Sequence, residues 1–496
     1  PARIVEEAIV GPSLGQEAID SGLSSFMLAL LVVLLYMVFY YSRAGMVACV
    51  ALLTNIFFIM GVLASLGAVL TLPGIAGIIL TIGMSIDANV LIFERVREEI
   101  RGGKGMGLAI TDGYKNAYTS IIDANVTTLL VGLILLYFGS GPIKGFATTL
   151  IIGIATSLFS AIFITRLIFI SFLKRKKDIS FSNRLTEGAF TNMNIQFLAK
   201  RKLFYGISTI IILGGMASLF TRGLNYGVDF TGGRSYVVRF DDIANATDVK
   251  TALTGAFESA PEVKTFGGDN QLKITTKYLI NNADTSSDRK VESALKSGLA
   301  GYSSFEIMSS QKVGPTIADD IKVGAVKSTI FGLLIVFLYI LLRFRKWQFG
   351  LGALAALFHD VVLVLSCFSI FYGFLPFSME MDQAFIAALL TVIGYSINDT
   401  VVVFDRIREY LGLYPKRDTG EVMNMAINST LSRTFNTSIS TFAVLLVIFI
   451  LGGEVIRGFS FALLLGVVVG TYSSICIATP VALDTFKKLA QQGKKR

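Results

Sequence analysis

The sequence predicts a polytopic α-helical membrane protein built from two parallel pseudo-repeat bundles, with a small α+β domain between membrane segments. Three observations predict this fold class: the composition, a series of long apolar segments, and motifs that recur in the same order in both halves. Of the 496 residues, 53% are hydrophobic and 16% are charged, whereas soluble domains carry about 25% charged residues. A soluble chain of this length would lack the polar side chains needed to cover its surface. Soluble, disordered, collagenous and disulfide-rich classes are therefore excluded.

Long apolar segments occur throughout the chain. A helix that crosses a bilayer needs about 20 mostly apolar residues, and eleven segments meet this requirement. Five lie in the first part of the chain, one near the middle and five in the last part: 24–41, 46–69, 73–95, 117–138, 143–172, 203–220, 325–343, 349–374, 383–405, 433–451 and 456–484.

Residues 221–324 interrupt the apolar pattern, because they are polar and mixed in charge. Their periodicity predicts strand, helix, strand, strand, helix and strand, an order typical of a ferredoxin-like sandwich. About 100 residues are enough for such a domain to fold alone. We therefore divide the chain into the end of a first exterior domain, a bundle of five helices, a cytoplasmic linker, a single helix, an exterior α+β domain, and five further helices with a basic tail: 1–23, 24–172, 173–202, 203–220, 221–324 and 325–496.

The positions of the charges predict how the chain is oriented. A net charge of +9 would suggest nucleic acid for a soluble protein, but here the location of the charges matters more than their sum. Lys and Arg cluster in alternate loops, such as 174–177, and at the chain end, 494–496. Basic loops face the cytoplasm in membrane proteins. We expect a lipid-bilayer environment, a cytoplasmic C-terminus, residues 221–324 and Pro1 outside, and no nucleic-acid partner.

Short motifs recur in the two halves in the same order. The stretch 83–90 (GMSIDANV) matches 394–401 (GYSINDTV), and 143–146 (IKGF) matches 456–459 (IRGF). Each copy begins on the same side, so the halves form a parallel repeat of a kind found in transporters. Residues 1–9 look like the last strand of an exterior domain. The repeat therefore predicts that the native protein has one more N-terminal helix and another exterior domain, giving twelve helices.

Ionisable side chains deep inside membrane helices are costly to bury and are functional candidates by default. Asp399 lies about 16 residues into its segment from the outer side. Desolvation disfavours its charged form, whereas Arg433, at a similar depth on the next helix, would favour it. Such a carboxyl group can load and release a proton as the helices rearrange, so we interpret Asp399 and Arg433 as a proton relay. The alternative is a static ion pair that fixes helix packing.

Asp87 occupies the corresponding helix of the first repeat, but it aligns with Asn398, one residue before Asp399. One residue is about 100° of rotation on a helix. The two acids therefore cannot be strict symmetry mates, and the halves are expected to have unequal roles. We include Asp87 in the proton relay, with a structural polar contact as the alternative.

The remaining polar residues at depth are secondary candidates: Asp123, Asp360, His359 and Asn398. His359 is the only histidine, and one histidine cannot build a zinc site. It could pass a proton or form a structural pair with Asp360. No phosphate-binding G-x-x-x-x-G-K-[ST] motif occurs, and the glycine-rich stretch 223–233 better suits tight turns. We expect no ATPase or other enzyme activity, no metal or cofactor, and protons as the coupling ion.

These segments resemble the SecD and SecF family of bacterial protein export. The stretch 87–95 (DANVLIFER) is similar to the SecD membrane motif, and 227–233 (GVDFTGG), 398–406 (NDTVVVFDR) and 432–434 (SRT) are similar to SecF motifs. The resemblance spans essentially the whole chain, with the motifs in family order. It implies membership of the RND (resistance–nodulation–division) superfamily and an RND-like pair of bundles.

The resemblance also implies a function. It implies an accessory subunit of the Sec translocase in the bacterial cytoplasmic membrane, using the proton motive force to promote export of secretory polypeptides. The partners would be the Sec translocon channel and the translocating unfolded polypeptide. Asp87, Asp399 and Arg433 would be the proton-path residues. Two alternatives are an RND-type exporter of small hydrophobic molecules or lipids, which the small α+β domain disfavours, and a passive scaffold held together by buried charges.

Overall fold

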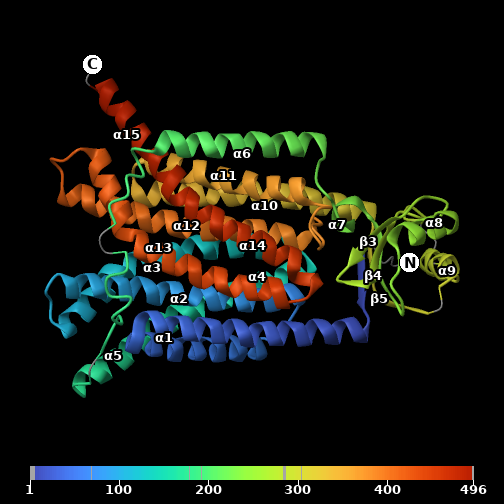
Figure 1. Cartoon of the computed structure of the whole chain (residues 1–496), viewed down its shortest axis with the longest axis horizontal. Helices are drawn as coiled ribbons and strands as arrows, with labels where there is room; N and C mark the ends of the chain where they lie inside the picture. Colours follow the sequence, from blue (N-terminus) through green and yellow to red (C-terminus); the bar gives the residue numbers. More distant parts are fainter. Residues whose placement is uncertain are drawn as a thin grey trace.

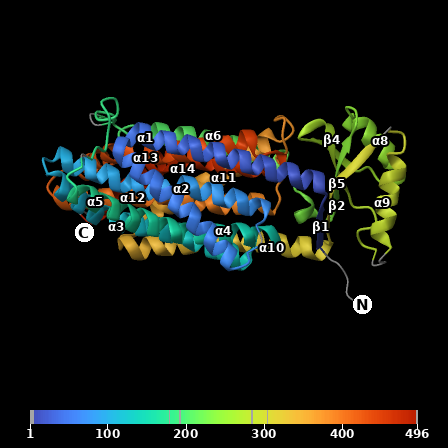
Figure 2. The ribbon, with the colours of Figure 1, turned by 90° about the horizontal axis from the view of Figure 1, so that it is seen from below.

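The computed structural model describes residues 6–68, 70–177, 179–190, 193–282, 286–302 and 304–493, with the backbone alone at 490, 492 and 493. The expectations for residues 1–5 and for the end of the basic tail, 494–496, lie outside these residues. The described part is a long helical bundle with one α+β domain at one end (Figures 1 and 2).

Among the described residues, ten helices are long and apolar enough to cross a membrane. Each predicted apolar segment overlaps one of these helices, and most of the helices extend beyond the predicted segment. They are α1 (Pro12–Ser65), α2 (Leu72–Arg101), α3 (Met106–Phe138), α4 (Gly141–Phe159) continuing into α5 (Thr165–Lys174), α6 (Arg201–Thr221), α10 (Pro315–Phe344), α11 (Trp347–Phe371), α12 (Gln383–Leu413), α13 (Thr419–Leu451), and α14 (Glu454–Ser473) continuing into α15 (Thr479–Gly493).

Helix α1 accounts for the difference between ten helices and the eleven predicted segments. Its 54 residues would span about 80 Å at 1.5 Å per residue, more than twice the hydrocarbon thickness of a bilayer. At Ser42 the backbone leaves the helical region, with φ 55° and ψ −125°. Beyond this point Cys49 Sγ lies 3.6 Å from the Leu34 carbonyl oxygen. The second arm therefore folds back on the first, and the two predicted segments meet at Ser42.

Helices α2 and α12 are the most enclosed of the ten. Helix α2 packs against α13, and α12 packs against α3, so each central helix contacts the other half of the chain. Glycines permit this approach: a Cβ added at Gly83 would lie 3.3 Å from Thr441 Oγ1, and one at Gly394 would lie 3.5 Å from Thr128 Cα. These central helices carry Asp87 and Asp399 into the middle of the bundle.

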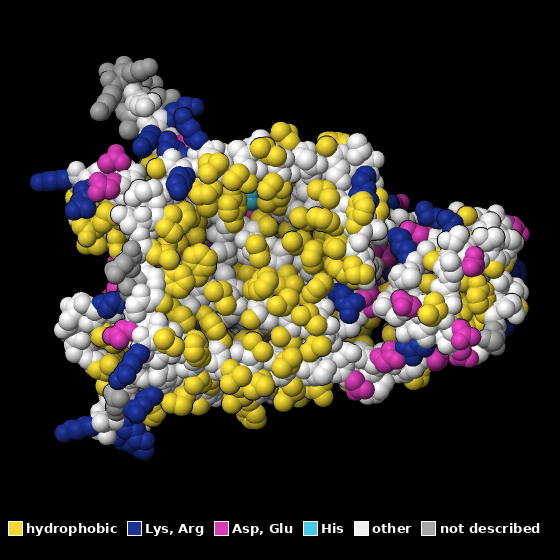
Figure 3. Space-filling model, in the orientation of Figure 1, with side chains coloured by type: hydrophobic (Ala, Val, Ile, Leu, Met, Phe, Trp, Pro, Cys, Tyr) yellow, Lys and Arg dark blue, Asp and Glu magenta, His cyan; other side chains and the backbone are white. Residues whose placement is uncertain are grey.

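The surface of the bundle matches a chain surrounded by lipid. Hydrophobic side chains cover the helical part on the face seen in Figure 3. Lys and Arg gather at the end of the helices opposite the α+β domain, and the domain itself carries both signs of charge (Figure 3). Apolar side chains that face lipid and charged side chains at the helix ends are the expected distribution for a membrane protein.

The α+β domain has its strands and helices in the predicted order. They are β2 (Gly233–Phe240), α8 (Ala246–Ala256), β3 (Glu262–Phe266), β4 (Gly268–Thr276), α9 (Ser287–Gly298) and β5 (Phe305–Val313). With β1 (Glu6–Val10) at one edge, the sheet order is β1-β5-β2-β4-β3, and every pair is antiparallel. Alternate side chains point to opposite faces: Val238 and Ile274 pack with α8 and α9, whereas Lys273 reaches toward the bundle. The second face of the sheet thus covers one end of the helices.

The prediction for residues 1–23 needs correction. Glu6–Val10 forms β1, which pairs with β5 at the edge of the same sheet. Helix α1 then begins at Pro12, not at residue 24, because a proline at the first helical position is preorganised for a helix. Helix α10 likewise begins at Pro315, before the predicted 325. The polar first turns of α1 contact the sheet: Arg239 Nη2 of β2 donates to Glu17 of α1 at 2.6 Å.

The glycine-rich stretch 223–233 forms turns, as predicted. It contains the short helix α7 (Val228–Thr231), which ends at Gly232 with φ 65° and Gly233 with φ 143°. Both values favour glycine, and a Cβ at Gly233 would lie 2.9 Å from the Thr276 carbonyl oxygen. The segment leads the chain from α6 into β2 and places Asp229 beneath the sheet.

Candidate functional site

Asp399 of α12 and Arg433 of α13 face each other near the middle of their helices. Their side chains are 3% and 5% exposed, and Arg433 Nη1 lies 3.3 Å from Asp399 Oδ1. Ser438 Oγ donates to Asp399 Oδ2 over a long 3.5 Å. Arg433 Nε has no hydrogen-bond partner among the described residues. A buried ion pair with unsatisfied groups costs stability, and its position inside a membrane segment makes it a functional candidate.

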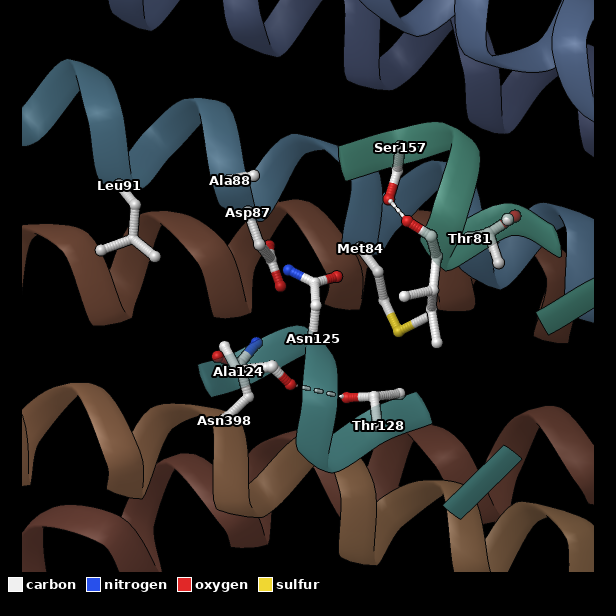
Figure 4. Close-up of a pocket in the computed structure, with 12 residues that line it drawn as sticks. Thr81, Met84, Asp87, Ala88, Leu91, Ala124, Asn125, Thr128, Ser157 and Asn398 are labelled. Carbon is white, nitrogen blue, oxygen red and sulfur yellow. Dashed lines mark hydrogen bonds between the residues drawn. The ribbon is translucent and has the colours of Figure 1, made fainter. Parts of the chain in front are cut away.

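Asp87 of α2 approaches this pair from the first half. It is 5% exposed, and its Oδ1 atom has no hydrogen-bond partner in the described part of the chain. Asp87 and Asn398 line one cavity between α2, α3, α4 and α12, where Asp87 points toward Asn125 (Figure 4). Asn398 Oδ1 also accepts from Arg433 Nη2 at 3.5 Å. Asn398 therefore links the cavity beside Asp87 to the Asp399–Arg433 pair.

His359 and Asp360 of α11 form a closed network inside the second half. His359 Nδ1 lies 2.9 Å from Asp360 Oδ1, and His359 Nε2 lies 3.0 Å from Ser208 Oγ of α6. Asp360 Oδ2 accepts from Ser396 of α12 at 2.5 Å and from Ser473 of α14 at 2.8 Å. Every polar atom of both side chains thus has a partner. This arrangement favours the structural alternative for the pair, tying four helices together.

Asp123 of α3 is paired across the two halves. Arg343 Nε of α10 donates to its Oδ2 at 2.5 Å, and Tyr339 Oη donates to its Oδ1 at 2.8 Å. In the sequence, Arg343 lies at a helix end, where a basic residue indicates the orientation of the helix in the membrane. Nothing in the sequence indicates that the partner of Arg343 lies in the other repeat. With both carboxylate oxygens bonded, Asp123 is a packing contact between halves.

Four charges at the end of the bundle opposite the α+β domain form a reciprocal clasp, which sequence reasoning missed. Arg95 of α2 bonds Glu409 of α12 at 2.9 Å, while Arg406 of α12 bonds Glu98 of α2. Each Arg also pairs with the Glu three residues later on its own helix, at 3.1 and 3.0 Å. The four residues occupy matching positions in the repeated motifs 83–98 and 394–409. This correspondence between the two repeats is the sequence signal that could have predicted the clasp.

A cavity of about 480 Å³ lies beside this clasp, between the two halves. Its walls include Glu94, Arg95 and Glu98 near the end of α2, and Arg433 at its inner side. Arg433 is therefore within reach of the end of the bundle that lies away from the α+β domain.

A second polar cluster joins the α+β domain to the N-terminus of α12. Asp229 Oδ2 accepts from the Gln383 backbone N–H at 2.9 Å, and Asp382 Oδ1 accepts from that of Phe385 at 2.8 Å. Both carboxylates thus satisfy free N–H groups at a helix start. Lys273 Nζ of β4 lies 2.5 Å from Glu380 Oε2.

The charges of this cluster perturb one another. Burial, assisted by the charge of Asp229, raises the pKa of Asp382 to about 7. Burial also raises the pKa of Asp229, although the Gln383 backbone N–H lowers it in part. Burial alone would lower the pKa of Lys273, but the neighbouring carboxylates, Glu380 first among them, together outweigh burial and the pKa is raised. The pKa values of Asp382 and Asp229 therefore both lie above their usual range at the boundary between domain and bundle.

Comparisons with known proteins place these features in a family. The model described as "Protein export membrane protein SecD/SecF, C-terminal" matches residues 2–175 and 293–488, and the "SecD/SecF GG Motif" matches 217–242. A protein translocase subunit SecDF of Brucella abortus is 36% identical over 483 residues, 97% of this chain and 62% of that protein. A subunit SecF of Rhodothermus marinus is 46% identical over 60% of this chain and 94% of its own length.

A solved structure agrees with these sequence matches. The crystal structure of SecDF from Thermus thermophilus, described as a translocon-associated membrane protein, superposes with a TM-score of 0.88 at 33% identity. The match covers 98% of this chain and 65% of that one. The chain thus spans less than two thirds of the Brucella and Thermus relatives.

Proposed function

Because the chain belongs to the SecD/SecF family of protein-export membrane proteins, we propose that it acts in an accessory subunit of the Sec translocase. In this proposal the proton motive force drives motions that promote export of secretory polypeptides across the bacterial cytoplasmic membrane. The partners are the Sec translocon channel and the unfolded translocating chain. The observation that carries the proposal is the buried Asp399–Arg433 pair, at 3.3 Å, beside Asp87 on the other half, whose Oδ1 atom has no hydrogen-bond partner among the described residues.

Three arrangements support the finer description of the fold as two pseudo-repeats with a ferredoxin-like domain. The clasp is reciprocal, since Arg95 pairs with Glu409 as Arg406 pairs with Glu98. A π turn interrupts the helix at Ser160–Ile164 in the first half and at Ser474–Ala478 in the second. The strand order β5-β2-β4-β3 with both helices on one face is the arrangement expected for a split βαβ sandwich.

The distribution of basic residues supports the orientation. Lys and Arg gather at the end opposite the α+β domain (Figure 3), and such clusters stay in the cytoplasm. The α+β domain then lies outside, and the cavity that reaches Arg433 opens toward the cytoplasm.

The proposed cycle moves one proton at Asp399. Protonation neutralises the carboxylate and removes its attraction to Arg433, and release of the proton restores the pair. A proton that crosses the full membrane potential supplies about 2.3 kcal/mol per 100 mV. Asp399 lies 17 residues along α12 from Asp382, or about 25 Å along a helix. A shift of α12 at Asp399 would therefore reach the cluster that holds the α+β domain.

The experiment that tests the proposal uses the protein reconstituted with the Sec channel in proton-loaded vesicles. Asp399→Asn should abolish both proton flux and proton-driven export while the protein still inserts. The matched control is Asp123→Asn, another buried carboxylate beside an Arg, which should keep proton flux. Normal export by Asp399→Asn would overturn the proposal. Extrusion of a hydrophobic dye without export would favour the exporter alternative.

A further inference from the structure

A cavity of about 260 Å³ lies between the two halves, at the end of the bundle that carries the α+β domain. Its walls come from α3 and α4 of the first half and from α10 and α12 of the second, with Glu6 of β1 beside them. Figure 2 shows α4, α10 and β1 at this end of the bundle. We propose that the cavity binds phosphatidylethanolamine, with the ammonium group held by carboxylates and part of an acyl chain against the apolar wall. This inference goes beyond the proposed function, because the proton relay does not involve this cavity.

The part of the cavity inside the bundle is apolar. It is lined by Leu135 and Phe138 of α3, Ile321 of α10, and Ile386 and Leu390 of α12. An apolar wall does not hold ordered water, because a buried water needs polar partners for its hydrogen bonds. An acyl chain covers such a wall with apolar surface, which is favourable for both. The wall therefore fits the hydrocarbon part of a lipid.

The cavity lies next to the surface that faces lipid. Phe138 and Ala325 of its wall are only half-buried. Their neighbours in sequence, Tyr137 and Val326, are 81% and 60% exposed, and both belong to helices long and apolar enough to cross a membrane. A phospholipid in the leaflet on the side of the α+β domain can therefore reach the cavity without passing through the bundle.

The polar part of the cavity is acidic. Two exposed carboxylate side chains, Glu6 and Asp320, line it, and no Lys or Arg of the described chain does. Asp319 pairs with Lys322 at 3.0 Å, whereas Asp320 has no ion pair within the described part of the chain. Burial, together with the charge of Asp229, raises the pKa of Glu6. A cation beside Glu6 and Asp320 would stabilise their charged forms.

These two parts together select the head group. The ammonium group of phosphatidylethanolamine has three N–H donors, and its hydrogen bonds to carboxylates are of the strong, charge-assisted kind. Phosphatidylglycerol is anionic and has no ammonium group, so the two carboxylates would repel it. A soluble amine would pair with the carboxylates but leave the apolar wall uncovered. An amphiphile with an ammonium head group matches both parts of the cavity.

Hydrogen bonds connect the acidic side of the cavity to both halves and to the α+β domain. Ser140 Oγ, between α3 and α4, donates to Gln383 Oε1 of α12 at 2.7 Å, and the Gln383 side chain also hydrogen-bonds Glu6 of β1. The Gln383 backbone N–H donates to Asp229 below the sheet. A head group bound at Glu6 would therefore stabilise the arrangement in which the two halves and the domain meet at Gln383.

The test locates the bound lipid and measures which head group is preferred. The purified protein is placed in phosphatidylglycerol nanodiscs that contain a trace of phosphatidylethanolamine with a photoactivatable group on its acyl chain. Cross-linked peptides are identified by mass spectrometry. We expect cross-links within 135–143 or 317–325. Replacing part of the phosphatidylglycerol by unlabelled phosphatidylethanolamine should lower these cross-links about tenfold, the factor expected for one hydrogen bond to a charged group, and leave cross-links to α6 unchanged.

Matched variants separate the effect of charge from the effect of shape. Asp320→Asn removes a carboxylate from the cavity, and Asp319→Asn removes the adjacent carboxylate, which does not line it. Gly324→Leu fills the cavity, because a Cβ at Gly324 would meet only the Phe138 carbonyl oxygen, at 3.9 Å. Its control is Gly206→Leu on α6, where nothing lies within 4 Å of an added Cβ.

Asp320→Asn should remove the preference for phosphatidylethanolamine, and Gly324→Leu should abolish the cross-links, while both controls behave as the wild type does. Equal competition by the two lipids in the wild type would overturn the proposal, as would equal losses in Asp320→Asn and Asp319→Asn. If Gly324→Leu fails to fold, Asp320→Asn still decides, because Asp320 is exposed. Neither a translocon nor a proton gradient is present, so this proposal and the proposed function can fail separately.

Discussion

Removing one charge from the Asp399–Arg433 pair should cost more stability than removing both, whereas proton transport should be lost in either case. At 3.3 Å and an effective dielectric constant of about 20, the two charges attract by about 5 kcal/mol. Arg433→Gln leaves the carboxylate buried without its counter-ion, so we expect a loss of about 3 to 5 kcal/mol in the free energy of unfolding. Asp399→Asn with Arg433→Gln removes both charges, and the double variant should be more stable than Arg433→Gln alone, because replacing a buried pair is often nearly neutral.

The assay is a double-mutant cycle measured by unfolding in detergent micelles, together with proton flux in vesicles. All three variants should lack proton flux, although the double variant recovers stability. Additive losses in the cycle would show that the two side chains do not interact. A double variant with normal proton flux would refute the relay and support the scaffold alternative, because the charges would then matter only for packing.

Three further outcomes concern ion pairs and hydrogen bonds away from Asp399. Glu98→Arg should lower the free energy of unfolding, and adding Arg406→Glu should restore about 0.5 kcal/mol of it, because Glu98 is 43% exposed; a double-mutant cycle without coupling would contradict the clasp. The stabilisation that Asp382 and Asp229 contribute to docking of the α+β domain, followed by hydrogen exchange in β4, should be complete below about pH 3.8 and be lost as the pH rises through about 7, because both carboxyl groups favour their protonated forms in the folded cluster. Asp382→Asn should flatten this profile, and an unchanged profile would contradict the assignment. Asp360→Asn should cost about 3 kcal/mol in thermal unfolding, because one of the two acceptor oxygens in a buried network is replaced by an NH₂ donor; a loss below about 1 kcal/mol would argue against that network.

The membrane segments could be predicted because an apolar run that spans a bilayer is a local property of the sequence. The α+β domain could be predicted for a similar reason, since its strands and helices follow one another in the predicted order. The predicted start of α1 was too late in the sequence, because the first turns after Pro12 are polar and pack against the sheet. Apolar periodicity gives no signal for such a contact. The Asp399–Arg433 contact follows from matched depth on consecutive helices, also a local argument.

Contacts between the halves could not be predicted in the same way. Asp123 and Arg343 lie on α3 and α10, and their 2.5 Å contact depends on how the two bundles dock. For His359 the sequence allowed more than one role. Its residue type and its depth are compatible with proton transfer, and only the structure shows that both ring nitrogens are hydrogen-bonded, to Asp360 and Ser208. Lys273 and Glu380 were missed because the sequence places one in the domain and the other in a loop between helices.

The two halves are most alike at the clasp and least alike at mid-depth, and this difference bears on how one proton could produce a directed motion. At the clasp, α2 and α12 make equivalent Arg–Glu contacts with each other, so the two helices have the same role there. Toward the middle, α2 presents Asp87 where α12 presents Asn398, and the acid of α12 lies one residue further on, rotated by about 100°. Asp87 faces the cavity between the halves, while Asp399 faces Arg433 within the second half. The clasp is symmetric, whereas the charges at mid-depth are asymmetric. A change in the charge of Asp399 can therefore move α12 relative to α2 while the clasp remains their common contact. The proposed coupling requires this geometry.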